Sequence, residues 1–236
     1  MPSLRYSNSD AQWVPAQRLN LKEIRRSLKR TQLNFTRLNK SLEVRRAPLT
    51  DEVIDNLMEG YGFVDEALVA GVGLLARGHS ELILELNSLV LLGSSQAQRD
   101  AFDSHIEYSR QHFYEMTDGG IGSLMEWQDH HTGDSLWHRA AGLYIQILSQ
   151  PQLFMEGNHR TAILLVSFLL VKEGYPPFVL SPGNARALLN HSKKIENLRK
   201  HSLGMLLHFS GYRNRLADTL RGNLDQRHLS PVSGVR

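Results

Sequence analysis

Apolar residues recur every three or four positions along most of the chain, which is the spacing of amphipathic helices. The first clear run begins at Leu21 and predicts a helix of about 24 residues, with Asn20 as its N-cap and Glu23 at its third position. Residues 1–18 show no sustained period, so we expect an irregular N-terminal arm there. The basic first helix then occupies the segment 19–47.

The same spacing predicts further helices as far as residue 221. Thr50 is followed by two acids, which predicts an N-cap for a helix reaching about Met58, and Gly60 and Gly62 are expected to interrupt the chain after it. Later helices are expected at 65–77, 80–92, 96–116, 135–149, 160–172, after Ser181-Pro182, at 192–200 and at 202–221.

The remaining segments contain turn-forming residues and no long strand pattern. Segment 118–134 is rich in Gly and Asp and reads as mostly loop, and 222–236 reads as a loose tail. No internal repeat is visible. The predicted fold class is therefore all-α, a single helical bundle over 48–221 with at most a small β-hairpin.

Charge is distributed unevenly. The whole chain carries a formal +3, but the stretch 18–46 holds ten basic residues against two acids, so the rest of the chain is net acidic. Helix 22–46 could therefore bind nucleic acid or an acidic protein. The chain shows no helix-turn-helix pattern and no aromatic residues interleaved on that face, so nucleic acid is the less favoured partner.

Several functional classes are excluded or disfavoured by composition. The chain has no cysteine, which excludes disulfides, thiolate metal sites and a cysteine nucleophile. Its eleven histidines show no His-Glu-x-x-His spacing. The longest apolar run, Ala162–Val171, is about half of what a bilayer requires, and no signal pattern opens the chain. We expect a cytoplasmic protein without a membrane partner.

The segment 152–160, Gln-Leu-Phe-Met-Glu-Gly-Asn-His-Arg, stands just before the most apolar predicted helix. Gly157 can adopt a positive φ and, with Asn158 and His159, turn successive backbone N–H groups inward where the helix begins, which makes an anion site. Arg160 could clamp phosphate oxygens. Read as structure alone, the same residues are a turn glycine, an N-cap and the start of a helix.

Glu156 lies beside this arginine in sequence and supplies a hard oxygen ligand suited to Mg²⁺. The structural alternative is that Glu156 and Arg160 form only a solvated i,i+4 pair. Phe154 is expected to anchor the loop to the core.

Phe154-x-Glu-Gly-Asn-x-Arg160, with an apolar helix after it, resembles the motif of Fic/Doc proteins, His-x-Phe-x-(Asp/Glu)-(Gly/Ala)-Asn-(Gly/Lys)-Arg. Supporting similarity lies at three further places: Pro48-Leu49-Thr50, 83–87 and Arg139-Ala140-Ala141. The resemblance covers roughly residues 36–210 and implies a Fic-type helical fold. It also implies transfer of AMP from ATP and Mg²⁺ onto a hydroxyl of a target protein.

Carried over position by position, the resemblance makes Glu156 the metal-binding acid, residues 157–159 the anion nest and Arg160 the phosphate-binding arginine. Three departures follow. Gln152 stands where the family has its histidine general base, and a second family arginine is replaced by Ile163. The third concerns Glu43, which resembles the glutamate of an inhibitory helix but lacks that arginine as a partner.

These departures leave three hypotheses. The first is a protein that binds a Mg-nucleotide but is altered or inactive in AMPylation, because an amide does not accept the proton. The second is an active transferase with a substitute base, for which His159 is one candidate. The third is an interaction module that uses helix 22–46. Self-association is possible in each, and the target protein is not identified by the sequence.

Overall fold

The computed structural model describes residues 17–231. Within this range the chain forms ten α-helices, one 3₁₀ turn and a two-stranded sheet, so the predicted all-α class is confirmed. The elements in chain order are β1 Gln17–Leu19, α1 Leu21–Lys40, α2 Asp51–Val69, α3 Ser80–Leu92, α4 Gln96–Ala101, α5 Asp103–Glu115, α6 Ile121–His130, α7 Leu136–Leu148, α8 Asn158–Lys172, α9 Ala185–Glu196, α10 Leu203–Arg221, η1 Gln226–His228 and β2 Leu229–Pro231.

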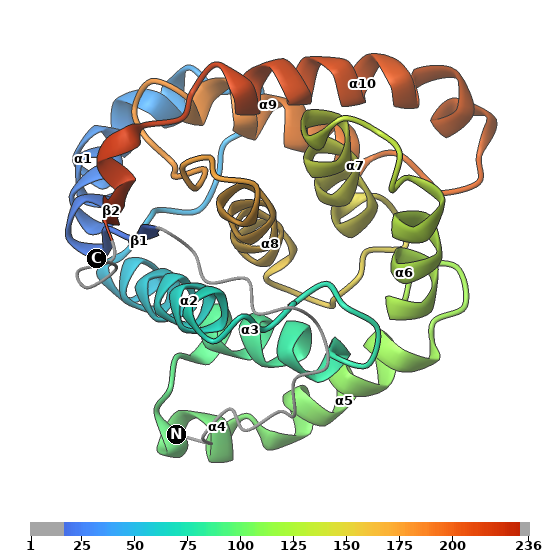
Figure 1. The fold of residues 1–236 in the computed structure, drawn as a ribbon, viewed down its shortest axis with the longest axis horizontal. Helices are drawn as coiled ribbons and strands as arrows, with labels where there is room; N and C mark the ends of the chain where they lie inside the picture. Colours follow the sequence, from blue (N-terminus) through green and yellow to red (C-terminus); the bar gives the residue numbers. More distant parts are fainter. Residues whose placement is uncertain (1–16, 232–236) are drawn as a thin grey trace.

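Helix α8 lies at the centre of the bundle, where Figure 1 views it nearly end-on. It packs against α2, α3 and α7, and its buried residues occur on every face. Three of its leucines, at 164, 165 and 170, have no exposed surface. A helix that is apolar all round is stable only inside a core, as the sequence predicted for this segment. The first turn of α8 therefore begins a helix that is buried along most of its length.

Helix α2 differs most from its predicted form, because it continues through Gly60 and Gly62 to Val69. A Cβ at Gly60 would lie 2.4 Å from Leu164 Cδ1, so this glycine allows α2 and α8 to approach closely. The separate helix predicted at 65–77 was wrong: its first part belongs to α2, and turns follow from Ala70. Both glycines that read as breakers thus lie inside a helix, Gly60 as a packing residue and Gly62 with open space around it.

Two helices end or begin at residues other than those predicted, because asparagine side chains bond to nearby backbone groups. Helix α1 ends at Lys40, since the side-chain amide of Asn39 bonds to the backbone N–H and C=O of Arg46, at 2.8 and 2.9 Å, and folds the chain back. Helix α9 begins only after Asn184, whose Oδ1 accepts from the N–H of Ser181. Helix α9 then continues through residue 192, where a separate helix was predicted to begin.

The segment 118–134 was expected to be mostly loop, but it contains α6. Its stability comes from tertiary packing: the Trp127 ring covers α7 where a Cβ at Gly142 would lie 2.3 Å from ring carbon Cζ2. The helix expected at 96–116 is divided into α4 and α5 at Phe102, where the backbone leaves the helical region.

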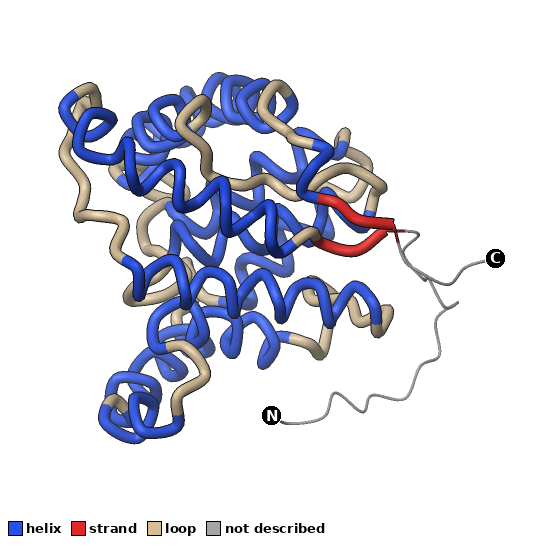
Figure 2. The backbone as a smooth tube through the Cα atoms, turned by 90° about the vertical axis from the view of Figure 1, so that its left-hand side faces the viewer, coloured by secondary structure: helices blue, strands red, loops and turns tan. Residues whose placement is uncertain are grey.

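The two ends of the described chain meet, as Figure 2 shows, in a short antiparallel sheet that pairs β1 with β2. The buried carboxylate of Asp65 on α2 holds β1 by accepting from the N–H of Leu19 and from the Arg18 guanidinium. The expectation of a loose tail at 222–236 was therefore wrong for residues 226–231. A three-residue strand has too little sequence pattern to be recognised, and its pairing is decided by the fold. Of the arm expected at 1–18, residues 1–16 lie outside the described range.

Candidate functional site

Aromatic packing anchors the loop between α7 and α8 to helix α5. Phe154 is buried and stacks on Phe113 of α5, with ring centroids 5.2 Å apart and planes 8° apart. This is the anchoring role expected of Phe154. At the loop's entrance the backbone of Gln150 bonds to that of Leu198 and Lys200, each at 2.7 Å. The loop is thereby joined to both α5 and the segment after α9.

Gly157 adopts the left-handed conformation that the sequence suggested, with φ at 76° and ψ at 0°. A Cβ here would also lie 2.7 Å from Nδ2 of Asn87 on α3. That amide donates to the carbonyl of Glu156 and to the hydroxyl of Thr161, both at 3.0 Å. Asn87 therefore fixes the turn from the α3 side, and only glycine fits the turn without strain.

Asn158 is buried and uses its side chain to shape the loop. Its Oδ1 accepts from the N–H of Phe154 at 2.9 Å, and its Nδ2 donates to the carbonyl of Phe154 at 2.7 Å. The same Nδ2 lies 3.1 Å from Oε1 of Gln152. All three bonds close the loop on itself, so Asn158 organises the site through its side chain.

The backbone of residues 158–160 presents unused donors. The first N–H of this region with a partner is that of Thr161, which bonds to the carbonyl of Gly157; within residues 17–231 the three preceding N–H groups have none. Unpaired N–H groups at the positive end of a helix dipole attract an anion. These N–H groups lie at the position where the sequence predicts an anion nest, and the start of α8 is called the nest below.

Arg160 is held at the edge of this nest. Its Nη1 donates to the carbonyl of Val90 on α3, and its other guanidinium N–H groups have no partner in the described part of the chain. Burial lowers the pKa of this guanidinium, and the nearby Glu156 carboxylate offsets part of that effect. Glu156 itself is exposed. The two side chains are electrostatic neighbours and form no ion pair within 4 Å.

The side chain of Gln152, which the motif resemblance aligns with a histidine, forms hydrogen bonds at both of its polar atoms. Its Nε2 donates to the carbonyl of Leu148 at 3.1 Å, while its Oε1 accepts from Asn158. The backbone carbonyl of Gln152 accepts from Nε2 of His112 on α5 at 2.9 Å. The side-chain amide of Gln152 therefore connects α7 to Asn158 in the loop.

His159 lies in a polar cluster between α7, α8 and α9. Its Nδ1 is 3.0 Å from the hydroxyl of buried Tyr144, and its Nε2 bonds to Glu196, which also accepts from Arg46 and Lys193. Burial opposes ionisation of Glu196, but the hydrogen bonds from His159 and Arg46 outweigh it and hold its pKa well below the usual range. Both ring nitrogens of His159 are engaged, so this side chain ties α8 to α9.

Glu43 lies just beyond the end of α1. Its carboxylate is 3.1 Å from Nζ of Lys194, and its N–H donates to Oδ1 of Asn190 at 3.1 Å. Both partners belong to α9, whose last residue, Glu196, contacts His159. The segment that was compared with an inhibitory helix is therefore connected to the candidate site through α9.

Four contributors to the site were not identified by sequence reasoning: His112, Tyr144, Glu196 and Lys200. Lys200 is buried and donates to the carbonyl of Pro151 at 2.6 Å, and burial lowers its pKa to about 8. These residues lie 15 to 49 positions from the loop residues they contact. Their proximity depends on packing of α5, α7 and α9, and no local motif indicates it.

No family model, curated protein or solved structure matches this chain. The resemblance to Fic/Doc proteins therefore rests on the sequence motif alone.

Metal and membrane sites can be assessed within residues 17–231. No group of three or more His, Asp or Glu side chains is placed to hold a metal ion there. Glu156 alone suits Mg²⁺ when phosphates complete the coordination, as is common for this ion. None of the described helices is long and apolar enough to cross a membrane.

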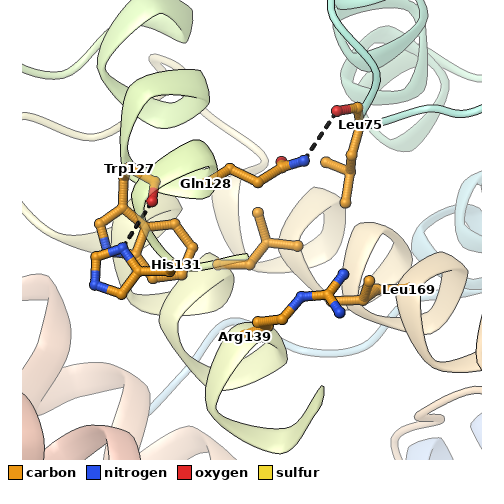
Figure 3. A pocket seen from close by; sticks show the side chains of 7 residues that line it. Leu75, Trp127, Gln128, His131, Arg139 and Leu169 are labelled. Carbon is orange, nitrogen blue, oxygen red and sulfur yellow. Dashed lines mark hydrogen bonds between the residues drawn. The ribbon is translucent and has the colours of Figure 1, made fainter. Parts of the chain in front are cut away.

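Arg139, which contributed to the family resemblance, lies away from the nest. It lines a cavity of about 20 Å³ beside Trp127, His131 and Leu169 (Figure 3). Gln128 borders the same space and donates to the carbonyl of Leu75 at 3.0 Å, while its Oε1 is buried without a partner. The volume suits a single water that would satisfy this oxygen.

Three of the seven basic residues on α1 pair with nearby acids. Arg25 pairs with Asp55 and Lys29 with Asp51, both on α2, at 2.7 Å, and Arg26 pairs with a glutamate on α1 itself. The acidic start of α2 therefore offsets two of the positive charges on α1, while Lys22, Arg30, Arg37 and Lys40 have no ion pair within residues 17–231.

Proposed function

We propose that the start of α8 binds the phosphates of a nucleotide, with Mg²⁺ as counter-ion, and that the protein is altered or inactive as an AMPylating transferase. The observation that carries this proposal is the row of unpaired N–H groups at 158–160, presented after a left-handed glycine. The first N–H groups of a helix have no partner within it, so a row of them presented after a left-handed glycine suits an anionic ligand.

The side chains beside the nest fit the same ligand. Arg160 is held in place by one bond to α3 and keeps further donors for phosphate oxygens. Glu156 is exposed next to it and has the carboxylate that Mg²⁺ takes alongside phosphates. Bound Mg²⁺ would neutralise phosphate charge. The identification of the nucleotide as ATP comes from the family resemblance.

Reduced catalysis follows from Gln152. An amide does not take a proton from a hydroxyl near neutral pH, and general-base catalysis contributes about 10²–10⁴-fold in rate. Both functional atoms of the Gln152 side chain are also engaged, one with Leu148 and one with Asn158. The side chain therefore supports the loop.

A second candidate, an active transferase with a substitute base, is favoured by one observation, the position of His112. Its Nε2 donates to the backbone carbonyl of Gln152, which leaves Nδ1 of a neutral ring as a proton acceptor. His159 is less suited to this role because Tyr144 and Glu196 engage both of its nitrogens. Transfer of a phosphate-containing group other than AMP also fits this candidate.

Calorimetric titration with ATP and Mg²⁺ tests the binding proposal. We expect binding by the unaltered chain and affinity about tenfold weaker or worse in Arg160→Met, because charge-assisted bonds to phosphate are lost. Arg37→Met is the matched control, since Arg37 is an exposed arginine on α1, and it should bind like the unaltered chain. Absence of binding by the unaltered chain, or equal affinity of both variants, would refute the proposal.

Labelled ATP and cell lysate separate the two candidates. If only the base is missing, Gln152→His should gain labelling of lysate proteins over the unaltered chain. If His112 is a substitute base, the unaltered chain should already transfer label, and His112→Ala should abolish this while binding ATP normally. Labelling that persists in His112→Ala would exclude His112 as the base.

A further inference from the structure

A second recess lies away from the nest, between α1, the loop that precedes α9 and the segment that follows α10. Its volume is about 440 Å³, and none of the residues 152–160 lines it. Figure 1 shows the red C-terminal segment crossing beside α1, and residues of both line the recess. The loop before α9 is fixed against α1 by a bond from the Thr31 hydroxyl to the carbonyl of Leu180 at 3.2 Å. All three walls are therefore held together by defined contacts.

The charged groups of the recess sum to a net positive charge. Arg30 lines it and has no ion pair within residues 17–231, unlike Arg25, Arg26 and Lys29 on the same helix. Arg227 also lines it, but its guanidinium forms a two-pronged pair with Asp225, at 2.6 and 3.0 Å, so these two charges cancel. Arg30 is thus a cation without a counter-ion in the described structure.

The loop before α9 adds hydrogen-bond donors to the same space. The hydroxyl of Ser181 and the N–H of Gly183 have no partner within the described residues, and both residues line the recess. They stand at the N-terminal end of α9, which is 12 residues long and carries the positive end of its dipole there. Hydroxyl, amide and guanidinium donors are the set that binds phosphate oxygens.

An independent observation comes from His228, which lines the recess and is only 3% exposed. Its Nε2 lies 2.8 Å from the hydroxyl of Ser27, and its Nδ1 is buried with no partner. Burial lowers the pKa of this imidazole, so the ring is neutral near pH 7. A buried ring nitrogen left unsatisfied is costly, and this ring forms part of the wall that a ligand in the recess would contact.

We propose that this recess binds a small organic phosphate at a site separate from the start of α8. The phosphate would contact Arg30, the Ser181 hydroxyl and the Gly183 N–H, and the remainder of the molecule would lie toward His228. A recess of this volume is within the range of small-molecule sites. Because the C-terminal segment forms one wall, binding would also fasten η1 and β2 onto α1.

NMR titration of the isotope-labelled full chain with ribose 5-phosphate tests the proposal, with ribose as the uncharged control. We expect saturable shifts of the Gly183 amide and the His228 ring with the phosphate and none with ribose. Arg30→Met should weaken the fitted affinity at least about tenfold. Arg37→Met, at an exposed site on the same helix, should leave it unchanged, as should Arg160→Met, which alters only the α8 site.

Three results would overturn the proposal: no saturable shift up to about 10 mM ribose 5-phosphate, an affinity unchanged in Arg30→Met, or shifts confined to residues 157–160. Ser181→Ala provides a second variant that removes a donor from an exposed loop without altering charge. It should weaken binding several-fold, and equal affinity would count against a phosphate at this position. Failure of ATP to bind at α8 would leave these outcomes unaffected.

Discussion

The two halves of the loop between α7 and α8 differ in how their polar groups are used. In the first half, Gln152 and the backbone of Phe154 are bonded to protein partners on every side. In the second half, the N–H groups of 158–160 have no such partners in the described structure. Satisfied groups hold a loop in shape, whereas a shaped row of unsatisfied donors suits a ligand. The first half of the loop is thus fixed by hydrogen bonds, and the second half presents N–H groups that are available to an anion.

The largest effect is expected from removing the group that connects the two halves. Asn158→Ala deletes three hydrogen bonds and leaves the buried N–H and C=O of Phe154 without partners, which costs about 2–4 kcal/mol of unfolding free energy. Urea denaturation measures this loss of unfolding free energy. Asn197→Ala, at the exposed end of α9, is the control and should cost well under about 1 kcal/mol. Similar losses of unfolding free energy in both variants would show that the Asn158 hydrogen bonds stabilise the protein no more than an exposed asparagine does.

A smaller effect is expected from Gly157→Ala, which acts on the nest alone. A left-handed alanine costs about 1–2 kcal/mol, and its Cβ would also crowd the Asn87 amide. Gly174→Ala is a close control, because Gly174 has a φ of 82° and open space around it. Both variants should lose stability, but only Gly157→Ala should lose affinity for ATP and Mg²⁺ by calorimetry. Equal affinities would argue that the nest does not bind the nucleotide.

The smallest effect concerns acid pH and the cluster that ties the nest to α9. The pKa of Glu196 is lower in the folded chain than its ordinary value of 4.5, so its stabilisation is complete above that value and is lost as the pH falls. Unfolding free energies measured from pH 7 to pH 2 should therefore fall more steeply in the unaltered chain than in Glu196→Gln. Parallel curves would exclude this carboxylate as a source of the acid sensitivity.

Local sequence patterns predicted some structural elements correctly and others incorrectly. Asn20 and Thr50 cap α1 and α2 as predicted, since a side chain bonding three residues ahead needs only local sequence. Gly157 has the expected positive φ, and Phe154 the expected buried position. Gly60 was misread, because its role is contact with α8, and contacts between distant segments leave no periodic signal. The same reason applies to β2, a strand of three residues.

By itself, the sequence determined the helical class, the buried character of α8 and the order of residues 152–160, because periodicity, turn chemistry and composition act over short stretches. Only the tertiary structure decided that His159 contacts Glu196, that Asn87 fixes the turn at Gly157 and that the C-terminal segment closes a recess beside α1. These contacts join residues 37 to 201 positions apart. Their formation depends on how helices pack, which the spacing of residues within each helix does not specify.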